Sequence, residues 1–197
     1  MLKTIIFDLS EVYLQGLLGT HKLLSKRLKL KVENLDLIAP ETYELFKGKI
    51  SEDEFWRTMR AKKKWDINVK ELKKIVRMNF REVEGTRDII EKLKEKGYKL
   101  GLLSVHAKEW VDHCEKKFDY HKLFHSILYS FEIEVCKPER KAYESMLDKI
   151  GSKAEDCLFV DDNHENLVAA EKLGIQTILF ESAEQLGDEL KKRDIIL

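Results

Sequence analysis

The segment Thr4-Ile-Ile-Phe-Asp-Leu-Ser-Glu-Val-Tyr-Leu14 decides the fold class, because within it a short apolar run ends in a carboxylate. Thr4–Phe7 has the length and composition of a buried strand, and Asp8 follows it directly. Open α/β sheets bind their ligands at the carboxyl ends of the strands, which is where Asp8 would then lie. A surface or capping carboxylate gives the same local pattern, so the rest of the chain has to distinguish the two interpretations.

Further apolar runs recur along the chain with a spacing typical of a parallel sheet. They are Lys99–Leu103, Ser126–Tyr129, Cys157–Val160 and Thr177–Phe180. After about residue 84 they alternate with amphipathic helical segments at Thr86–Lys96, Glu139–Ile150 and Glu165–Leu173, and a glycine ends each of these segments. The order strand, helix, glycine, strand is typical of βαβ units. We therefore predict a Rossmann-like α/β fold with a parallel five-stranded sheet and helices on both faces.

The stretch between the first two apolar runs has helical periodicity almost throughout and no convincing strand. The expected helices are His21–Lys29, Pro40–Lys47, Ser51–Lys62 and Lys70–Phe80. Ser51 and Glu54 form a capping box at the start of the third helix. An all-helical block inserted after the first strand lies over the carboxyl edge of the sheet. We predict a core of residues 1–14 and 83–197, with a helical cap of residues 15–82 that covers Asp8.

Composition and charge exclude several classes of function. The 197 residues include 36 basic and 36 acidic side chains, and a formal net charge of zero argues against a nucleic-acid or acidic-membrane binder. Cys114, Cys136 and Cys157 are odd in number and lack CxxC spacing, which argues against a disulfide framework or a zinc site. No stretch approaches the roughly 20 apolar residues of a membrane span, and the first run is too short for a signal peptide. We expect a soluble cytoplasmic protein.

Other polar residues follow predicted strands in the way that Asp8 does. Ser104 ends the second run, Lys137 lies at a strand-to-helix loop, and the pair Asp161 and Asp162 follows the fourth run. Each residue alone is compatible with a helix cap, but two adjacent acids after a buried strand are costly unless they meet a cation or hydrogen-bond donors. Together they place three carboxylates, a hydroxyl and an ammonium at one edge. Such a set can hold Mg²⁺ and a phosphoryl group that Asp8 attacks.

On these residues the chain resembles the haloacid dehalogenase (HAD) superfamily over essentially its whole length. The matching motifs are F-D-L-S-E-V around Asp8, G-L-L-S ending at Ser104, C-K-P-E around Lys137, and F-V-D-D-N-H-E-N around Asp161 and Asp162. The helical block is similar to the C1-type cap of that superfamily. The last two motifs most resemble the small phosphatases related to the N-terminal domain of soluble epoxide hydrolase.

The resemblance implies a role for each matching residue. Asp8 is expected to be the nucleophile and a ligand of Mg²⁺. Ser104 and Lys137 are expected to bind the transferring phosphoryl group, the first by a hydrogen bond and the second by its charge. Asp162 is expected to ligate Mg²⁺ directly, and Asp161 to hold a metal-bound water or act as a second ligand. The implied protein is a Mg²⁺-dependent phosphatase of a small phosphorylated metabolite, working as a monomer or homodimer.

Ser10 is the clearest departure from the family pattern. The backbone carbonyl at this position is a family metal ligand, which a serine supplies as well, and the residue also borders the substrate. Phosphatases of the family carry an Asp here, which protonates the leaving oxygen and then activates water. Serine does neither well at neutral pH, and general acid–base catalysis contributes roughly 10²–10⁴-fold. Glu11 replaces the usual Gly and could supply a carboxylate, although its side chain should point away from that of Ser10.

Two alternatives to a phosphatase therefore stay open. Ser10, together with Val105 where many relatives carry Asn, also fits a non-catalytic relative that binds a phosphorylated ligand or a protein partner. A 2-haloacid dehalogenase needs the Asp8 nucleophile but no acid for the leaving group. Against that alternative, the pair Asp161 and Asp162 makes little sense without a metal.

Overall fold

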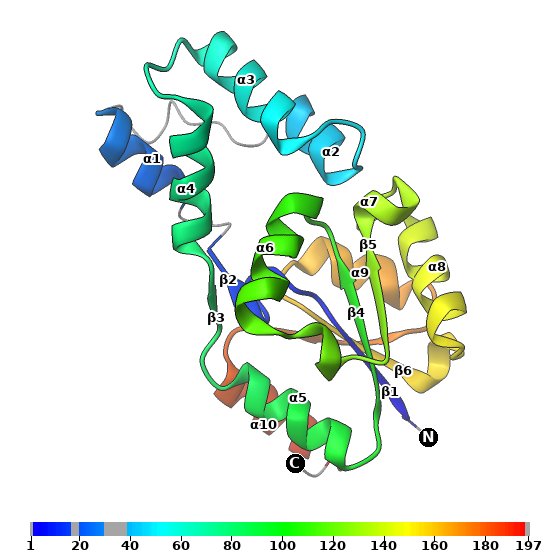
Figure 1. Ribbon diagram of the computed structural model, residues 1–197. Coiled ribbons are helices and arrows are strands. Elements are labelled where there is room, and N and C mark those ends of the chain that lie inside the picture. Colours follow the sequence, from blue (N-terminus) through cyan, green and yellow to red (C-terminus); the bar gives the residue numbers. More distant parts are fainter. Residues whose placement is uncertain (1, 17–19, 30–38, 196–197) are drawn as a thin grey trace.

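A five-stranded parallel sheet forms the centre of the computed structural model, which describes residues 2–16, 20–29 and 39–195 (Figure 1). Its strands are β1 (Thr4–Phe7), β4 (Lys99–Ser104), β5 (Ser126–Tyr129), β6 (Cys157–Asp161) and β7 (Gln176–Leu179), in the order β5-β4-β1-β6-β7. Every neighbouring pair is parallel. The five predicted runs agree with these strands to within one residue at each end. The predicted Rossmann-like α/β fold is confirmed.

β1 lies in the middle of the sheet because its side chains are apolar on both faces. Ile5 and Phe7 belong to the apolar cluster on one face, and Ile6 belongs to the cluster on the other. From β1 the chain builds outward through β4 and β5 on one side and through β6 and β7 on the other. The strand order therefore reverses at β1, and the crevice at such a reversal is where open α/β sheets bind ligands.

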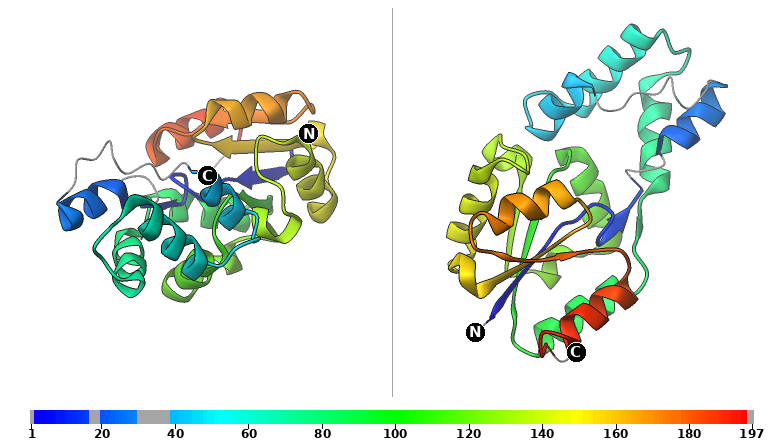
Figure 2. Two further views of the ribbon diagram at one scale, coloured as in Figure 1. Left: turned by 90° about the horizontal axis from the view of Figure 1, so that it is seen from above. Right: turned by 180° about the vertical axis from the view of Figure 1, so that it is seen from behind.

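Helices cover both faces of the sheet, and together with it they form what we call the α/β body (Figure 2). On the face of Ile5 and Phe7 the cluster includes residues of α5 (Thr86–Glu95), α6 (Lys108–Phe118) and α10 (Ala183–Lys191). The opposite cluster includes residues of α8 (Arg140–Ile150) and α9 (His164–Glu171). A short helix, α7 (Ser130–Ile133), and the 3₁₀ turns η2 (His121–Leu123) and η3 (Ala154–Asp156) complete the α/β body.

Four helices, which we call the helical insert, lie beyond the end of the sheet at which β1 ends (Figures 1 and 2). They are α1 (Thr20–Leu28), α2 (Pro40–Phe46), α3 (Glu52–Lys63) and α4 (Val69–Asn79). Ser51 caps α3, since its Oγ accepts a hydrogen bond from the Glu54 backbone N–H at 3.2 Å. Residues 17–19 and 30–38 of the predicted cap lie outside the described residues. No helix of the described ranges is long and apolar enough to cross a bilayer.

The expectation that this stretch contains no strand is wrong at its two ends. β2 (Leu14–Gln15) pairs antiparallel with β3 (Arg81–Glu82) where the insert leaves and rejoins the α/β body. Two residues are too few to show an alternating pattern, and the pairing depends on segments that are distant in sequence. These short strands coincide with the ends of the predicted cap, residues 15–82. The division into a core of residues 1–14 and 83–197 and that cap stays a prediction.

Candidate active site

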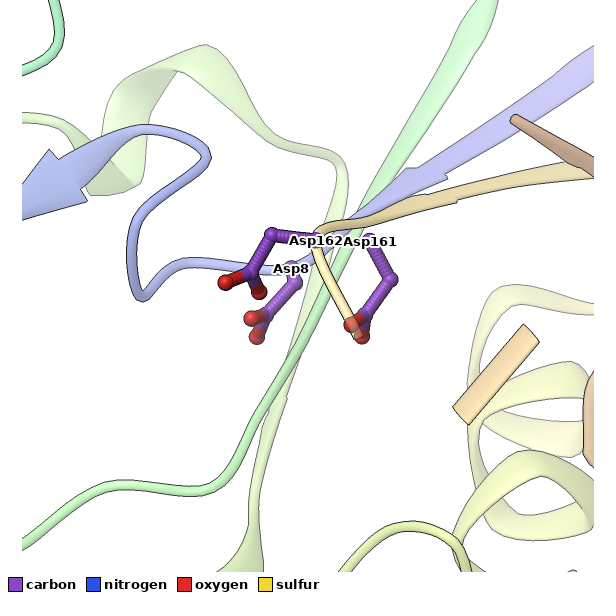
Figure 3. A group of neighbouring side chains, drawn as sticks. All are labelled: Asp8, Asp161 and Asp162. Atoms are coloured by element: carbon purple, nitrogen blue, oxygen red, sulfur yellow. The ribbon is translucent and has the colours of Figure 1, made fainter. Parts of the chain in front are cut away.

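Three carboxylates converge at the carboxyl ends of β1 and β6 (Figure 3). Asp8 follows β1, and its backbone N–H extends the pairing with β6 by donating to the Val160 carbonyl at 2.8 Å. Asp161 is the last residue of β6, and Asp162 comes next. One oxygen from each carboxylate lies within 4.8 Å of the others. Asp8 and Asp161 are buried, whereas Asp162 is exposed, so the group is open to solvent on one side.

Lys137 links two of these carboxylates from the loop before α8. Its Nζ lies 2.7 Å from Asp8 Oδ1 and 2.6 Å from Asp161 Oδ2, and its side chain is 2% exposed. Burial alone would lower the pKa of Lys137, but Asp161 and Asp8 together raise it above its ordinary value. The ammonium is therefore charged, and it lies beside Asp8 as the sequence predicts.

Asp161 has its hydrogen-bonding capacity taken up by neighbouring residues. Besides Lys137, the Asn163 backbone N–H donates to Oδ1 at 2.8 Å, and Asn166 Nδ2 donates to Oδ1 and Oδ2 at 3.0 and 3.1 Å. The Tyr143 hydroxyl in turn donates to the Asn166 carbonyl at 2.8 Å. Asn166 was not among the predicted site residues, although the spacing V-D-D-N-x-x-N contained it. This arrangement makes Asp161 a fixed support for Lys137.

The cluster carries an excess of negative charge. Burial raises the pKa of Asp8 to about 7, with Lys137 opposing and Asp161 and Asp162 adding to the shift. Burial and Asp161 likewise raise the pKa of Asp162 to about 6, with Lys137 again opposing. Once all three carboxylates are ionised, they and the ammonium have a formal charge of −3 + 1 = −2. A divalent cation with a preference for oxygen ligands matches both this charge and these donors.

Two hydroxyl groups at the same edge lack a hydrogen-bond partner within residues 2–16, 20–29 and 39–195. The register pairs Phe7 with Leu102, so Ser104 lies one residue beyond the level of Asp8 on the neighbouring strand. Ser104 is 1% exposed, and among the described residues no hydrogen-bond partner is found for its Oγ or for the buried Oγ of Ser10. A buried polar group without a partner costs about 1–3 kcal/mol, so both hydroxyls are suited to a ligand that supplies the bond.

Glu11 does not offer a straightforward replacement for an acid at position 10. Its backbone has a φ of +60°, a left-handed conformation that disfavours residues with a Cβ and that glycine adopts without strain. Its Oε1 accepts a hydrogen bond from the Gly16 backbone N–H at 3.1 Å. The carboxylate therefore helps to shape the turn that follows β1.

A model of the haloacid dehalogenase-like hydrolases matches residues 5–180, which include every site residue described above. The chain belongs to this family. Family membership agrees with the parallel sheet, with the position of Asp8 after β1, and with the order in which Ser104, Lys137 and Asp161 follow along the chain.

Solved structures of other HAD-family proteins share the fold of this HAD-like hydrolase. A HAD family enzyme from Bacteroides thetaiotaomicron, in complex with magnesium and inorganic phosphate, has a TM-score of 0.79 at 22% identity and covers 92% of this chain and 96% of its own. A HAD-like hydrolase from Porphyromonas gingivalis has a TM-score of 0.81 at 20% identity and covers 98% of both chains. The L-2-haloacid dehalogenase of Xanthobacter autotrophicus is similar at a TM-score of 0.68, with 15% identity and coverage of 99% and 84%.

Curated relatives match a smaller part of the chain. Pyrophosphatase PpaX of Bacillus cereus is 28% identical over 96 residues, which span 49% of this chain and 44% of that protein. The PpaX protein of Bacillus mycoides is 27% identical over 97 residues, spanning 49% and 45%. This chain thus spans less than half the length of either relative.

Proposed function

We propose that this HAD-like hydrolase is a Mg²⁺-dependent phosphatase of a small phosphorylated metabolite and that Asp8 is its nucleophile. The observation that carries the proposal is the position of Asp8, which touches the buried ammonium of Lys137 and lies in one cluster with Asp161 and Asp162. The magnesium and phosphate bound by the structural relative from Bacteroides thetaiotaomicron support the same chemistry.

The residues present fit a magnesium ion. The formal charge of −2 and the two unpartnered hydroxyls are features that a cation and a phosphoryl group would satisfy. Asp8, the exposed Asp162 and the backbone carbonyl of Ser10 would hold the ion, while Asp161 stays engaged with Lys137 and Asn166. When bound, Mg²⁺ neutralises charge that develops on the phosphoryl oxygens.

The residues then divide the reaction between them. A carboxylate oxygen of Asp8 forms a bond to phosphorus, and the bond from phosphorus to the leaving oxygen breaks, which gives an aspartyl-phosphate. Lys137 and the Ser104 hydroxyl hold the phosphoryl oxygens during this step. A water molecule next attacks phosphorus and loses a proton to the departing phosphate or to solvent. The bond from phosphorus to the Asp8 oxygen breaks, which releases phosphate and regenerates the Asp8 carboxylate.

Ser10 limits which substrates react quickly. It cannot protonate a leaving oxygen at neutral pH, and the Glu11 carboxylate is engaged with the Gly16 backbone. Substrates whose leaving groups need little protonation are therefore favoured, among them aryl phosphates, acyl phosphates and sugar-1-phosphates. Water also lacks an activating carboxylate in the second step, so the aspartyl-phosphate is long-lived. Residues 15–82 act as the cap that selects among such substrates.

The test is a panel of these phosphate esters assayed with Mg²⁺ and with a chelator. The wild type releases phosphate only with the metal, and Asp8→Asn abolishes the release, since an amide is a poor nucleophile. Equal rates for the wild type and Asp8→Asn would overturn the proposal. Inorganic pyrophosphate belongs in the panel because the two curated relatives are pyrophosphatases.

The second candidate is a non-catalytic HAD-fold protein that binds a phosphorylated ligand, and the absence of an Asp at position 10 favours it. It predicts thermal stabilisation by phosphate with Mg²⁺ and no turnover of any ester in the panel. A 2-haloacid dehalogenase is a weaker candidate, since three clustered carboxylates suit a reaction that uses a metal. Halide release from a 2-haloacid in the presence of a chelator would favour it.

A further inference from the structure

Glu52 is a wholly buried carboxylate at the start of α3, with 0% of its surface exposed. Its Oε1 accepts hydrogen bonds from Trp110 Nε1 at 2.8 Å and from Trp56 Nε1 at 3.3 Å. Arg77 donates to Oε1 at 2.8 Å and to Oε2 at 2.6 Å. A buried carboxylate is tolerated only when it is paired and hydrogen-bonded, and these four hydrogen bonds meet that requirement.

Hydrogen bonds at Glu52 connect the helical insert to the α/β body. Trp110 and Glu109 belong to the first turn of α6, whereas Trp56 and Arg77 belong to α3 and α4 of the insert. The Glu52 backbone N–H also donates to Glu109 Oε1 at 3.0 Å. Two hydrogen bonds thus cross from the start of α3 to the start of α6, one through the side chain of Glu52 and one through its backbone.

Trp110 also contacts the segment that leads away from Ser104. Its ring meets that of His106 edge-on, with ring centres 5.7 Å apart at an angle of 90°. The centre of the Trp110 ring also lies 6.2 Å from the ring centre of Phe80, the residue just after α4. It lies 6.1 Å from the ring centre of Phe46, the last residue of α2. Trp110 therefore lies between the insert and the strand end that carries Ser104.

A second set of contacts joins the same two parts of the protein. The His106 backbone N–H donates to Ser130 Oγ at 3.2 Å, and this hydroxyl donates to the Phe46 carbonyl at 2.6 Å. Lys47 Nζ lies 3.4 Å from Glu139 Oε1. The insert is thus held against the loops that follow β4 and β5, at the edge where Asp8 lies.

We propose that Glu52 is a positioning residue, which holds the helical insert closed over the Asp8 edge and, through Trp110, fixes the segment that follows Ser104. The effect on catalysis rests on the proposed function, because closure alters turnover only if a substrate reacts at Asp8. A hydrogen bond to a charged group changes an equilibrium by roughly 10- to 100-fold. Loss of the Glu52–Trp110 bond shifts the insert toward an open arrangement to that extent.

Trp110→Phe tests the proposal, and Trp56→Phe is its matched control. Each variant removes one indole N–H donor from the same oxygen and keeps an aromatic ring. Of these two bonds, the one from Trp110 crosses from the α/β body to the insert, whereas the one from Trp56 lies within the insert. Trp110→Phe is expected to raise KM for 4-nitrophenyl phosphate roughly 10-fold and to change kcat by less than about threefold. It is also expected to accelerate amide hydrogen exchange in α2 and α3. Trp56→Phe leaves both measurements near the wild type.

A second pair of variants tests the same connection without altering a buried ring. Glu109→Ala removes the acceptor of the Glu52 N–H, whereas Glu109→Gln keeps an acceptor oxygen. Glu109→Ala is expected to accelerate amide hydrogen exchange at the start of α3 and to raise KM. Glu109→Gln is expected to keep both quantities at their wild-type values.

Hydrogen exchange needs no turnover, so it tests the position of the insert even if Asp8→Asn shows that the proposed function is wrong. Unchanged exchange in Trp110→Phe and in Glu109→Ala would overturn the proposal. Equal effects of Trp110→Phe and Trp56→Phe on exchange and KM would also overturn it. Glu52 would then form a buried ion pair that has no role in closure of the insert.

Discussion

Replacement of Ser10 by Asp is expected to accelerate hydrolysis of alkyl phosphates by about 10²–10⁴-fold, which corresponds to roughly 3–5 kcal/mol of activation free energy. The full 10²–10⁴-fold acceleration is expected because none of the described carboxylates at this edge is available to act as the acid in place of residue 10. Asp161 accepts four hydrogen bonds, and Glu11 binds the Gly16 N–H. Asp8 and Asp162 are the proposed nucleophile and metal ligand.

The same substitution is expected to destabilise the metal-free protein. Oxygens of three carboxylates already lie within 4.8 Å of one another. A fourth carboxylate at a similar separation adds about 3 kcal/mol of repulsion for each neighbour at an effective dielectric constant of about 20. Mg²⁺ offsets this repulsion, so the melting temperature of Ser10→Asp should depend on the metal more steeply than that of the wild type.

The assay compares phosphate release from an alkyl phosphate and from 4-nitrophenyl phosphate by the wild type and by Ser10→Asp. Ser10→Asn is the control, because Asn has nearly the shape of Asp but no acidic group. Ser10→Asp should accelerate the alkyl ester far more than the aryl ester, because only the poorer leaving group depends on protonation. Ser10→Asn should change neither rate. If Ser10→Asp binds Mg²⁺ and yet leaves both rates at the wild-type level, the acid–base argument is wrong.

Three further predictions concern stability and metal binding. Lys137→Met removes the ammonium shared by two buried carboxylates and should lower the free energy of unfolding by about 3–5 kcal/mol in urea titrations, with partial recovery in Mg²⁺. The pKa of Asp8 is raised from 3.8 to about 7, so the folded state binds its proton more tightly than the unfolded state does. Stability of the metal-free protein should therefore fall as pH rises from about 4 to 7, and Mg²⁺ affinity should rise over the same interval, as thermal unfolding and metal titration can measure. A melting temperature that does not change with pH across this interval in the presence of a chelator would contradict a raised pKa of Asp8 in the folded protein. Gly16→Ala should destabilise the protein by more than Gly97→Ala. The new Cβ at position 16 would meet a backbone oxygen of α4 at 2.4 Å, whereas no atom of the described part of the chain lies within 4 Å of a Cβ at position 97. Both positions have positive φ, so denaturation of the two variants separates the clash from the backbone strain.

The sequence alone determined the sheet and the placement of its chemistry. Short apolar runs and glycine-ended helices predict the five strands to within one residue at each end, because these patterns are local and the three central strands β4, β1 and β6 are buried over most of their length. The carboxyl end of each run then placed Asp8, Ser104 and Asp161 at one edge. That inference needed only the parallel topology, which the alternation of strands and helices implies.

Tertiary structure alone decided which partners these residues have. Nothing local in C-K-P-E states that Lys137 lies between Asp8 and Asp161, or that Asn166 donates to both oxygens of Asp161. Likewise, Glu52 lies in an acidic first turn of α3 that looks like an exposed capping sequence, and only the approach of Arg77 and Trp110 buries it. Local patterns determine periodicity and helix ends, whereas the energy of a buried charge depends on groups that folding brings in from distant segments. The segment Thr4–Leu14 therefore specified a strand with an acid at its end, and the surrounding fold decided how that acid is charged and covered.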